Sequence, residues 1–363
     1  MPFFPFTSDL LSHFMLMCVF AATMIMLSVG LNMTSSVMKF SNFAHAEFIT
    51  LGMYSSWWVL QMLSYLFPQD SGAYWINNIF VHSAYAFLIV GLLGIISEVL
   101  VFERIRSKRA SATTFVVASI GIGLIVRNML SMVFSDFPEK RGNFSGLCPA
   151  CSAESSFPAF LPDFLRQEYY IFEFSKNSPL WGTQSIRITT QEFYIIAIAI
   201  IVVVAVDFIF RKTKFGIAMR ATADNSELSQ VSGINTRRVI FYTWLLAGGI
   251  TGFGASFLRA NQPRFTSTDG FFLLLPLFSV MVLGGVGSFR GGVIAAVILA
   301  FARQATTILF SEFQKPRGIE SQLNLITLDP GYANGIGFVI LILILLFRPQ
   351  GLRGTQEATR ARV

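Results

Sequence analysis

The stretch FYIIAIAIIVVVAVDFIF, residues 193–210, decides the class of fold. It is a long apolar run, and Asp207 is its one charged residue. A helix needs roughly 20 apolar residues to cross the hydrocarbon core of a bilayer, which is about 30 Å thick. Lipid offers no partner to backbone N–H and C=O groups, so a segment that crosses it must be helical. The stretch therefore predicts a membrane-spanning helix.

Eight further apolar runs resemble this stretch, and the whole chain is 53% hydrophobic and 13% charged. Soluble domains carry about 25% charged residues, so the composition argues against a soluble fold. Polar or Gly-rich breaks in residues 41–54 and 271–310 leave re-entrant helices open. We expect one all-α, polytopic membrane helical bundle over residues 1–363, with about eight to ten transmembrane or re-entrant helices. The eight runs cover residues 11–31, 43–67, 79–102, 113–134, 239–258, 271–287, 291–310 and 331–347.

Lys and Arg are concentrated in three segments, two between apolar runs and one after the last run, which the positive-inside rule places in the cytoplasm. Segment 135–191 is instead nearly balanced, with five basic and six acidic residues, and segment 311–330 has two basic and three acidic residues. The two kinds of segment alternate along the chain, so we expect 135–191 and 311–330 outside and the C-terminus in the cytoplasm. The basic segments hold Arg104, Arg106, Lys108 and Arg109; Arg211, Lys212, Lys214, Arg220, Arg237 and Arg238; and Arg348, Arg353, Arg360 and Arg362.

The external insert, residues 135–191, is long for a connector and contains Cys148-Pro149-Ala150-Cys151. A zinc site needs a second pair of ligands, whereas the remaining cysteine, Cys18, lies in the first apolar run. A redox dithiol is open, although no thioredoxin-like pattern surrounds the motif. We favour a disulfide between Cys148 and Cys151 over free thiols, in an oxidising compartment. The length and side of the insert suggest that it helps to dock a solute-binding protein.

The chain lacks the usual motifs of nucleotide and metal chemistry. It has no Gly-Lys dipeptide and hence no phosphate-binding Walker A loop. Its histidines, His13, His45 and His82, show no metal-binding spacing, and no G-x-S-x-G motif is present. We therefore expect no metal, no cofactor, no enzymatic activity and no nucleic-acid partner. We expect membrane lipids around the bundle. If the protein moves solute uphill with ATP, the ATPase is a separate chain.

The first segment with a functional signal is residues 39–48, KFSNFAHAEF, which open an apolar run. Ser41 or Asn42 is a good helix N-cap, and Glu47 would then lie near the positive end of the helix dipole. Ionisable groups at membrane depth are costly and often functional. Two interpretations stay open for Glu47, a functional carboxylate or a group that satisfies a helix start near the cytoplasmic interface. For His45 we favour the second.

The second segment, residues 212–236, links two apolar runs on the cytoplasmic side and is long enough for a short helix. Gly233 is a plausible helix terminator. Arg220 and Asp224 are spaced i, i+4 and could pair. Such a helix can dock into a groove on a partner protein, although a solvated loop between two spans is also compatible.

The third segment, residues 282–292 (VLGGVGSFRGG), is too rich in glycine to remain a regular helix without loss. Its glycines permit close helix contact or a sharp reversal of the chain. Gly-interrupted apolar segments in both halves of a chain often mark a solute path. The corresponding pair would be residues 40–58 and 278–297.

These three segments resemble the permeases of branched-chain amino-acid ABC transporters, closer to the LivH type than to the LivM type. The matching blocks occur in the family's order and span most of residues 25–354. They are NFAHAEF (42–48) with LGMY (51–54), GIAMRA (216–221) with SGIN (232–235), and LGGVGS (283–288) with FRPQGL (347–352).

The resemblance implies one permease subunit of an ABC importer in a bacterial inner membrane. Its implied partners are cytoplasmic ABC ATPase subunits, a second permease subunit of the LivM type and a periplasmic solute-binding protein. Carried onto this chain, it assigns coupling to the ATPase and a translocation core. The coupling residues are Arg220, Ala221, Asp224 and Gly233, and the core residues are Asn42, His45, Glu47, Gly284, Gly285 and Gly287.

The sequence departs from the family pattern at Ala46, where Gly is common, at Ser229-Gln230 and in the length of the insert. The substrate therefore stays open among branched-chain amino acids, related amino acids, and urea or short amides. A stand-alone secondary transporter is the main alternative function, and a channel or structural membrane subunit is the third. Neither would need a docking segment at residues 215–233.

Overall fold

The computed structural model describes residues 6–66, 78–134, 190–260, 265–313, 335–347 and 351–352. Within these ranges the regular elements are all helices, which confirms the predicted all-α class. They are α1 (Phe6–Met38), α2 (His45–Leu66), α3 (Ile79–Ser97), a π-helical segment η3 (Glu98–Phe102), α4 (Glu103–Ser107), α5 (Ala112–Phe134), α6 (Thr190–Lys212), α7 (Lys214–Asp224), α8 (Ser226–Val231), α9 (Thr236–Ala260), α10 (Asp269–Gly284), α11 (Phe289–Phe313) and α12 (Gly335–Phe347).

Each of the nine apolar runs lies largely within one of the helices, or within α3 and η3 together. Among the described residues, six helices are long and apolar enough to cross a membrane by length and composition, which confirms a polytopic membrane bundle. Helices α2, α10 and α12 correspond to the other three runs. The six candidate spans are His13–Met38, Ile79–Ser107, Ala112–Phe134, Glu192–Lys212, Thr236–Ala260 and Phe289–Thr307.

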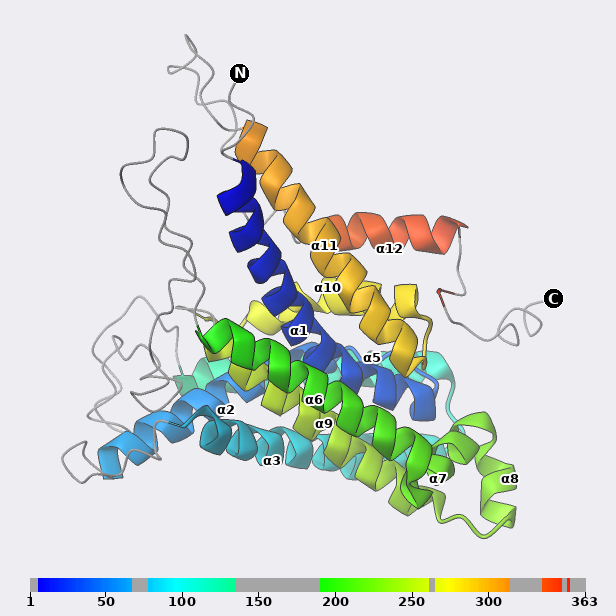
Figure 1. Cartoon of the computed structure of the whole chain (residues 1–363). Coiled ribbons are helices and arrows are strands. Elements are labelled where there is room, and N and C mark those ends of the chain that lie inside the picture. The colour runs from blue at the N-terminus through cyan, green and yellow to red at the C-terminus, as the bar shows by residue number, and fades with distance from the viewer. Residues whose placement is uncertain are drawn as a thin grey trace, which may run out of the picture.

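Helices α1 and α9 form the centre of the bundle (Figure 1). About 72% of the most apolar window of each is buried, against 22% for α5 and α6, which lie at the periphery. Helix α9 packs on α1, α2 and α3, whereas α11 lies along α1. Close approach of α3 and α9 depends on glycine, because a Cβ on Gly248 would collide with the backbone of Val90 and Gly91. Small residues are the usual means by which membrane helices pack closely.

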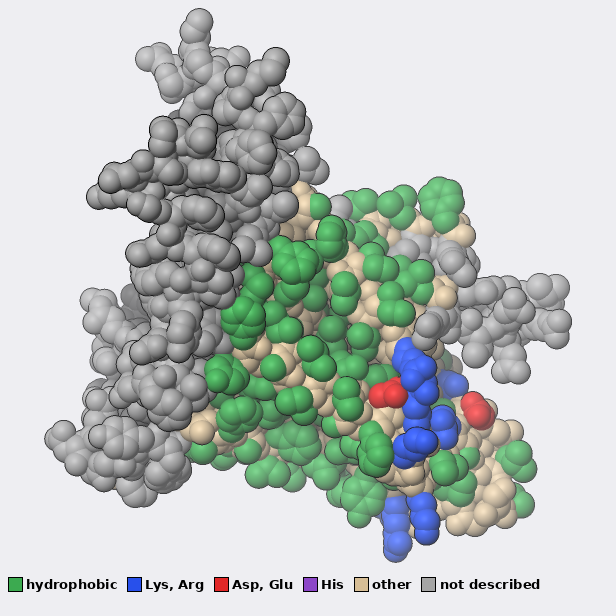
Figure 2. Space-filling view, viewed as in Figure 1, with side chains coloured by type: hydrophobic (Ala, Val, Ile, Leu, Met, Phe, Trp, Pro, Cys, Tyr) green, Lys and Arg blue, Asp and Glu red, His purple; other side chains and the backbone are tan. Residues whose placement is uncertain are grey.

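The outer surface of the bundle is largely apolar, as contact with the hydrocarbon core of a bilayer requires. Side chains on the outward face of α6, including Ile200, Ile201 and Val204, are about 60% exposed and apolar. Figure 2 shows a continuous apolar field with Lys and Arg side chains gathered at one end, the end at which α7 and α8 lie in Figure 1. This arrangement agrees with the positive-inside rule, while the side of the C-terminus stays a prediction.

Candidate functional site

The start of α2 lies inside the bundle. Asn42, His45 and Glu47 are at most 1% exposed. The Asn42 side chain accepts a hydrogen bond from the Ala44 backbone N–H at 3.1 Å, just before the helix begins at His45. The Phe43 N–H donates to the Ser119 hydroxyl of α5 at 3.1 Å. The helix start is therefore held by both its own cap and a neighbouring helix.

His45 connects three helices. Its Nε2 atom lies 3.0 Å from the Leu27 carbonyl of α1 and 3.3 Å from the Thr251 hydroxyl of α9. The Leu27 carbonyl can only accept, so the imidazole N–H donates to it, whereas the Thr251 hydroxyl donates to the Ala247 carbonyl at 2.7 Å. Gly30 of α1 faces this contact, and a Cβ there would collide with Thr251 and Ala247. The geometry gives His45 a role in holding α1, α2 and α9 together.

Glu47 forms a buried ion pair with Arg127 of α5. The Arg127 Nε donates to Glu47 Oε1 at 2.9 Å, and a second guanidinium nitrogen contacts the same oxygen. The Glu47 side chain is 2% exposed and that of Arg127 is 22% exposed. Removing one partner of a buried pair typically costs about 3–5 kcal/mol, because an unpaired charge is left in a medium of low dielectric.

The same pair reaches the start of α10. Thr50 donates to Glu47 Oε2 at 3.3 Å and accepts from the Gly270 N–H at 3.2 Å. The Arg127 guanidinium lies 4.5 Å from the centroid of the Phe271 ring, a cation–π contact. Glu47 is thus the centre of a network that joins α2, α5 and α10.

The Gly-rich segment is a tight reversal between α10 and α11, and it is also a close helix contact. Gly285 and Gly287 have φ values of +93° and +82°, which favour glycine. The Ser288 hydroxyl accepts from the Gly291 N–H at 3.1 Å, and a Cβ on Gly284 would collide with the backbone of Gly291. Both outcomes expected from the glycine pattern are therefore present in one turn.

The two parts of the C-terminal sequence block meet at this turn. The Leu352 N–H donates to the Leu283 carbonyl at 2.7 Å. Gly351 has a φ of +70° and lies against Val282 and Gly285, where no Cβ would fit. The segment after α12 therefore closes over the end of α10.

Helix α1 lies against both the start of α2 and the Gly-rich turn between α10 and α11. Gly30 lies against His45, and one helical turn or more further along Ser36 lies against Gly287. The Phe43 and Phe278 rings, 4.6 Å apart between centroids, add a direct contact between the α2 block and α10. Of the six predicted core residues, His45 and Gly287 thus lie against the second half of α1, whereas Glu47 is bonded to α5 and Gly284 lies against α11.

The predicted coupling segment consists of two helices, α7 and α8, and not of one. The Asn225 side chain causes the break, because it accepts from the backbone N–H groups of Glu227 and Leu228, both at 3.0 Å, and so starts α8. Thr213 caps α7 in the same way, accepting from the Gly216 N–H at 3.0 Å. Helix α7 packs on α6, α9 and α1, with Met219 fully buried.

The predicted helix terminator is confirmed. Gly233 has a φ of +83°, its N–H donates to the Gln230 carbonyl, and the Ile234 N–H donates to the Ser229 carbonyl at 2.9 Å. This is a Schellman motif with glycine at C′.

The predicted pairing of two other coupling residues is wrong. Arg220 and Asp224 are exposed on α7 and form no ion pair within the described part of the chain. The reason is that an exposed pair gains little over separate hydration. Ala221, the fourth predicted coupling residue, is half-buried on α7.

Two parts of the site were not anticipated from the sequence. Arg127 is the one charged residue in the apolar run 113–134, a signal that could have identified it. Thr251 gave no such signal. Cys148, Cys151 and most of the insert 135–191 lie outside the described residues. No group of three or more potential metal ligands gathers among the residues that the structure describes.

Comparison with known proteins places this geometry in context. The family model described as "Branched-chain amino acid transport system / permease component" matches residues 14–345. The "High-affinity branched-chain amino acid transport system permease protein LivH" of Escherichia coli strain K12 is 25% identical over 345 residues, covering 93% of this chain and 94% of the relative. The corresponding permease protein BraD of Pseudomonas aeruginosa is 22% identical over 343 residues, with the same coverage of each chain.

More distant similarity extends to sugar permeases. The "Fructose import permease protein FruF" of Bifidobacterium longum is 28% identical over 119 residues, which cover 31% of this chain and 33% of that protein. No solved structure matches this chain.

Proposed function

The chain belongs to the family of permease components of branched-chain amino acid transport systems and is a multi-pass inner-membrane protein, and on this premise we propose its place in an importer. It forms one of the two membrane-spanning halves of an ABC importer for branched-chain or related amino acids. A LivM-type permease is the other half. An external binding protein delivers the substrate, and separate cytoplasmic ATPase subunits drive transport.

The observation that carries this proposal is the α7–α8 unit. It presents apolar side chains at the surface, since Ile217, Leu228 and Val231 are 54%, 63% and 87% exposed. Helices α7 and α8 are not among the helices that are long and apolar enough to cross a membrane. Exposed apolar side chains are unfavourable in water, and a groove on a partner protein would bury them. The basic residues around the unit agree with a cytoplasmic partner.

The packing of α7 provides a route from such a partner to the buried region. Helix α7 contacts α9, and α9 holds Thr251 next to His45 of α2. Movement of α7 by an ATPase would therefore be transmitted to the helices that surround Asn42, His45 and Glu47. We propose that this movement opens the path to alternate sides of the membrane, with the Gly284–Gly287 turn as the second element of the core.

The test uses proteoliposomes that contain the whole assembly, with the binding protein outside and ATP inside. We expect ATP-dependent uptake of leucine, isoleucine or valine. Fructose, galactose and urea serve as alternative substrates. Uptake of any solute by this chain alone, without an ATPase, would replace the proposal with a secondary transporter.

Variants of the coupling segment test the observation itself. Leu228→Glu and Arg220→Glu should each lower uptake at least about ten-fold at unchanged abundance in the membrane, because both side chains are exposed and neither is needed for packing. Gly233→Leu should do the same through backbone strain. Arg104→Glu, exposed on α4, is the matched control. Uptake at the control level in both the Leu228 and Arg220 variants would remove the coupling role.

A further inference from the structure

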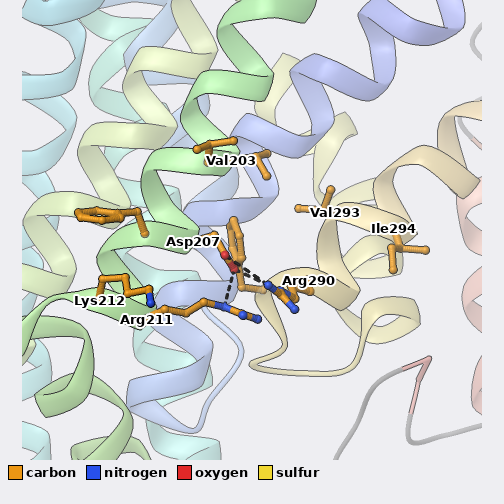
Figure 3. A pocket seen from close by; sticks show the side chains of 10 residues that line it. Val203, Asp207, Arg211, Lys212, Arg290, Val293 and Ile294 are labelled. Carbon is orange, nitrogen blue, oxygen red and sulfur yellow. Dashed lines mark hydrogen bonds and ion pairs between the residues drawn. The ribbon is translucent and has the colours of Figure 1, made fainter.

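A groove runs between α6 and α11 on the outer surface of the bundle. Both helices pack on α1, and they approach each other through side chains, including the stacked rings of Phe210 and Phe289 at 6.0 Å. The walls of the groove are mostly apolar, with Val204 and Phe208 on α6 and Ile294 on α11; Figure 3 labels Ile294. These three side chains are 40–62% exposed. The groove is therefore open on the outer surface of the bundle.

One end of the groove is strongly basic. Arg211, Lys212 and Arg290 line it together with a single carboxylate, Asp207. Arg290 donates to both oxygens of Asp207, at 3.2 and 3.4 Å, and Arg211 Nε lies 3.0 Å from Asp207 Oδ1, so one carboxylate is shared by two guanidinium groups (Figure 3). Three cations against one anion leave a net charge of +2 at this end. Arg211 and Arg290 are 45% and 50% exposed, which leaves donors available to a further anion.

The apolar part of the groove covers part of one leaflet of a bilayer. From Lys212 to Val203 the α6 axis rises about 14 Å at 1.5 Å per residue, of which the basic end up to Asp207 takes about 8 Å and the apolar part about 6 Å. Half of the hydrocarbon core is about 15 Å. The basic end lies next to α7, the side at which the other Lys and Arg residues gather. An anionic head group at the basic end and an acyl chain along the apolar walls would thus occupy the groove in the orientation that the membrane imposes.

We propose that the α6–α11 groove is a binding site for an anionic phospholipid. The phosphate binds Arg211 and Lys212, whereas Arg290 stays paired with both oxygens of Asp207. Arg offers a planar pair of donors that matches a phosphate. Basic pockets between membrane helices on the cytoplasmic side are a recognised kind of site for anionic head groups. A zwitterionic lipid would bring its own cation to this end and gain less.

The experiment uses native membrane vesicles that contain the complete assembly. Two photoreactive lipids with the same acyl chains are compared, phosphatidylglycerol and phosphatidylcholine, and the labelled peptides are identified by mass spectrometry. The variant is Arg211→Gln with Lys212→Gln, which keeps the Arg290–Asp207 pair. The matched control is Arg104→Gln with Lys108→Gln, which removes the same charge from exposed positions outside the groove.

We expect phosphatidylglycerol to label residues 203–212 and 289–294 in preference to phosphatidylcholine. The preference should fall about five-fold for each cation removed in the groove variant and stay unchanged in the control. Equal labelling by the two lipids, or a preference that survives in the groove variant, would overturn the proposal. Absence of label from both segments would also overturn it and would indicate that another protein chain covers the groove.

Discussion

Two ion-pair clusters in this protein use the same chemical groups in opposite ways. Glu47 and Arg127 meet inside the bundle, where the carboxylate is 2% exposed and is bonded by Arg127 of α5 and Thr50 of α2, both of which α10 contacts. Asp207 meets Arg211 and Arg290 at the lipid-facing surface, where the carboxylate is 29% exposed and outnumbered by cations. The first cluster is balanced and joins helices together. The second has an excess of positive charge, which suits it to bind an anionic ligand.

The largest effect is expected from breaking the buried pair. Arg127→Met should lower the free energy of unfolding by about 3–5 kcal/mol, because Glu47 is then buried without its partner. The measurement is thermal unfolding of the purified protein in detergent. The double variant Glu47→Gln with Arg127→Met should recover at least half of the loss, since it leaves no unpaired charge.

The control for this prediction is Arg237→Met. Arg237 pairs with Glu103 at 2.7 Å, but its side chain is 78% exposed. Such a pair contributes little, so the control should behave almost as the unmodified protein. An Arg127→Met protein that unfolds at the same temperature as the control would show that the buried cluster is not a structural link.

A smaller effect is expected from the hydroxyl that extends the buried network. Thr50→Val keeps the shape of the side chain but removes its bonds to Glu47 and to the Gly270 N–H, so the loss should be about 1–2 kcal/mol. Thr243→Val is the matched control, because Thr243 is equally buried and its hydroxyl bonds to the Val239 carbonyl of its own helix. If both substitutions cost the same in thermal unfolding, the Thr50 link between α2 and α10 contributes nothing specific.

The smallest effect on stability is expected at the surface cluster. Asp207→Asn should change the free energy of unfolding by less than about 1 kcal/mol, because Arg211 and Arg290 are both about half exposed. The change should shrink further between low and high salt, since exposed charges are screened. Comparison of melting temperatures at the two salt concentrations checks this. A loss as large as that of Arg127→Met, or one that salt leaves unchanged, would make the two clusters alike.

The sequence predicted local features well and contacts between helices poorly. The apolar runs, the cap at Asn42 and the helix end at Gly233 all follow from a few neighbouring residues, and the structure agrees with them. The partner of Glu47 did not follow, because it lies 80 residues further along the chain and depends on how α2 and α5 pack. Its signal was nevertheless present, as a lone Arg in an apolar run.

The coupling segment shows the same division on a smaller scale. Residues 212–236 were expected to hold one short helix, but Asn225 offers its side chain to two backbone N–H groups and starts a second one. Competition between a local side-chain cap and continuation of the helix is decided by small energies. The role of Arg220, Ala221, Asp224 and Gly233 in coupling stays a prediction, as does that of the six core residues.

The closure of Leu352 over Leu283 also has a consequence for the order in which the protein is made. The Leu283 carbonyl is synthesised roughly 70 residues before its partner, an interval on the order of 3 to 14 s at ordinary translation rates. During that time the turn between α10 and α11 is inserted without its cover. The hydrogen bond from Leu352 to Leu283 therefore forms later than the contacts among α1 to α11, whose residues are all made before residue 351.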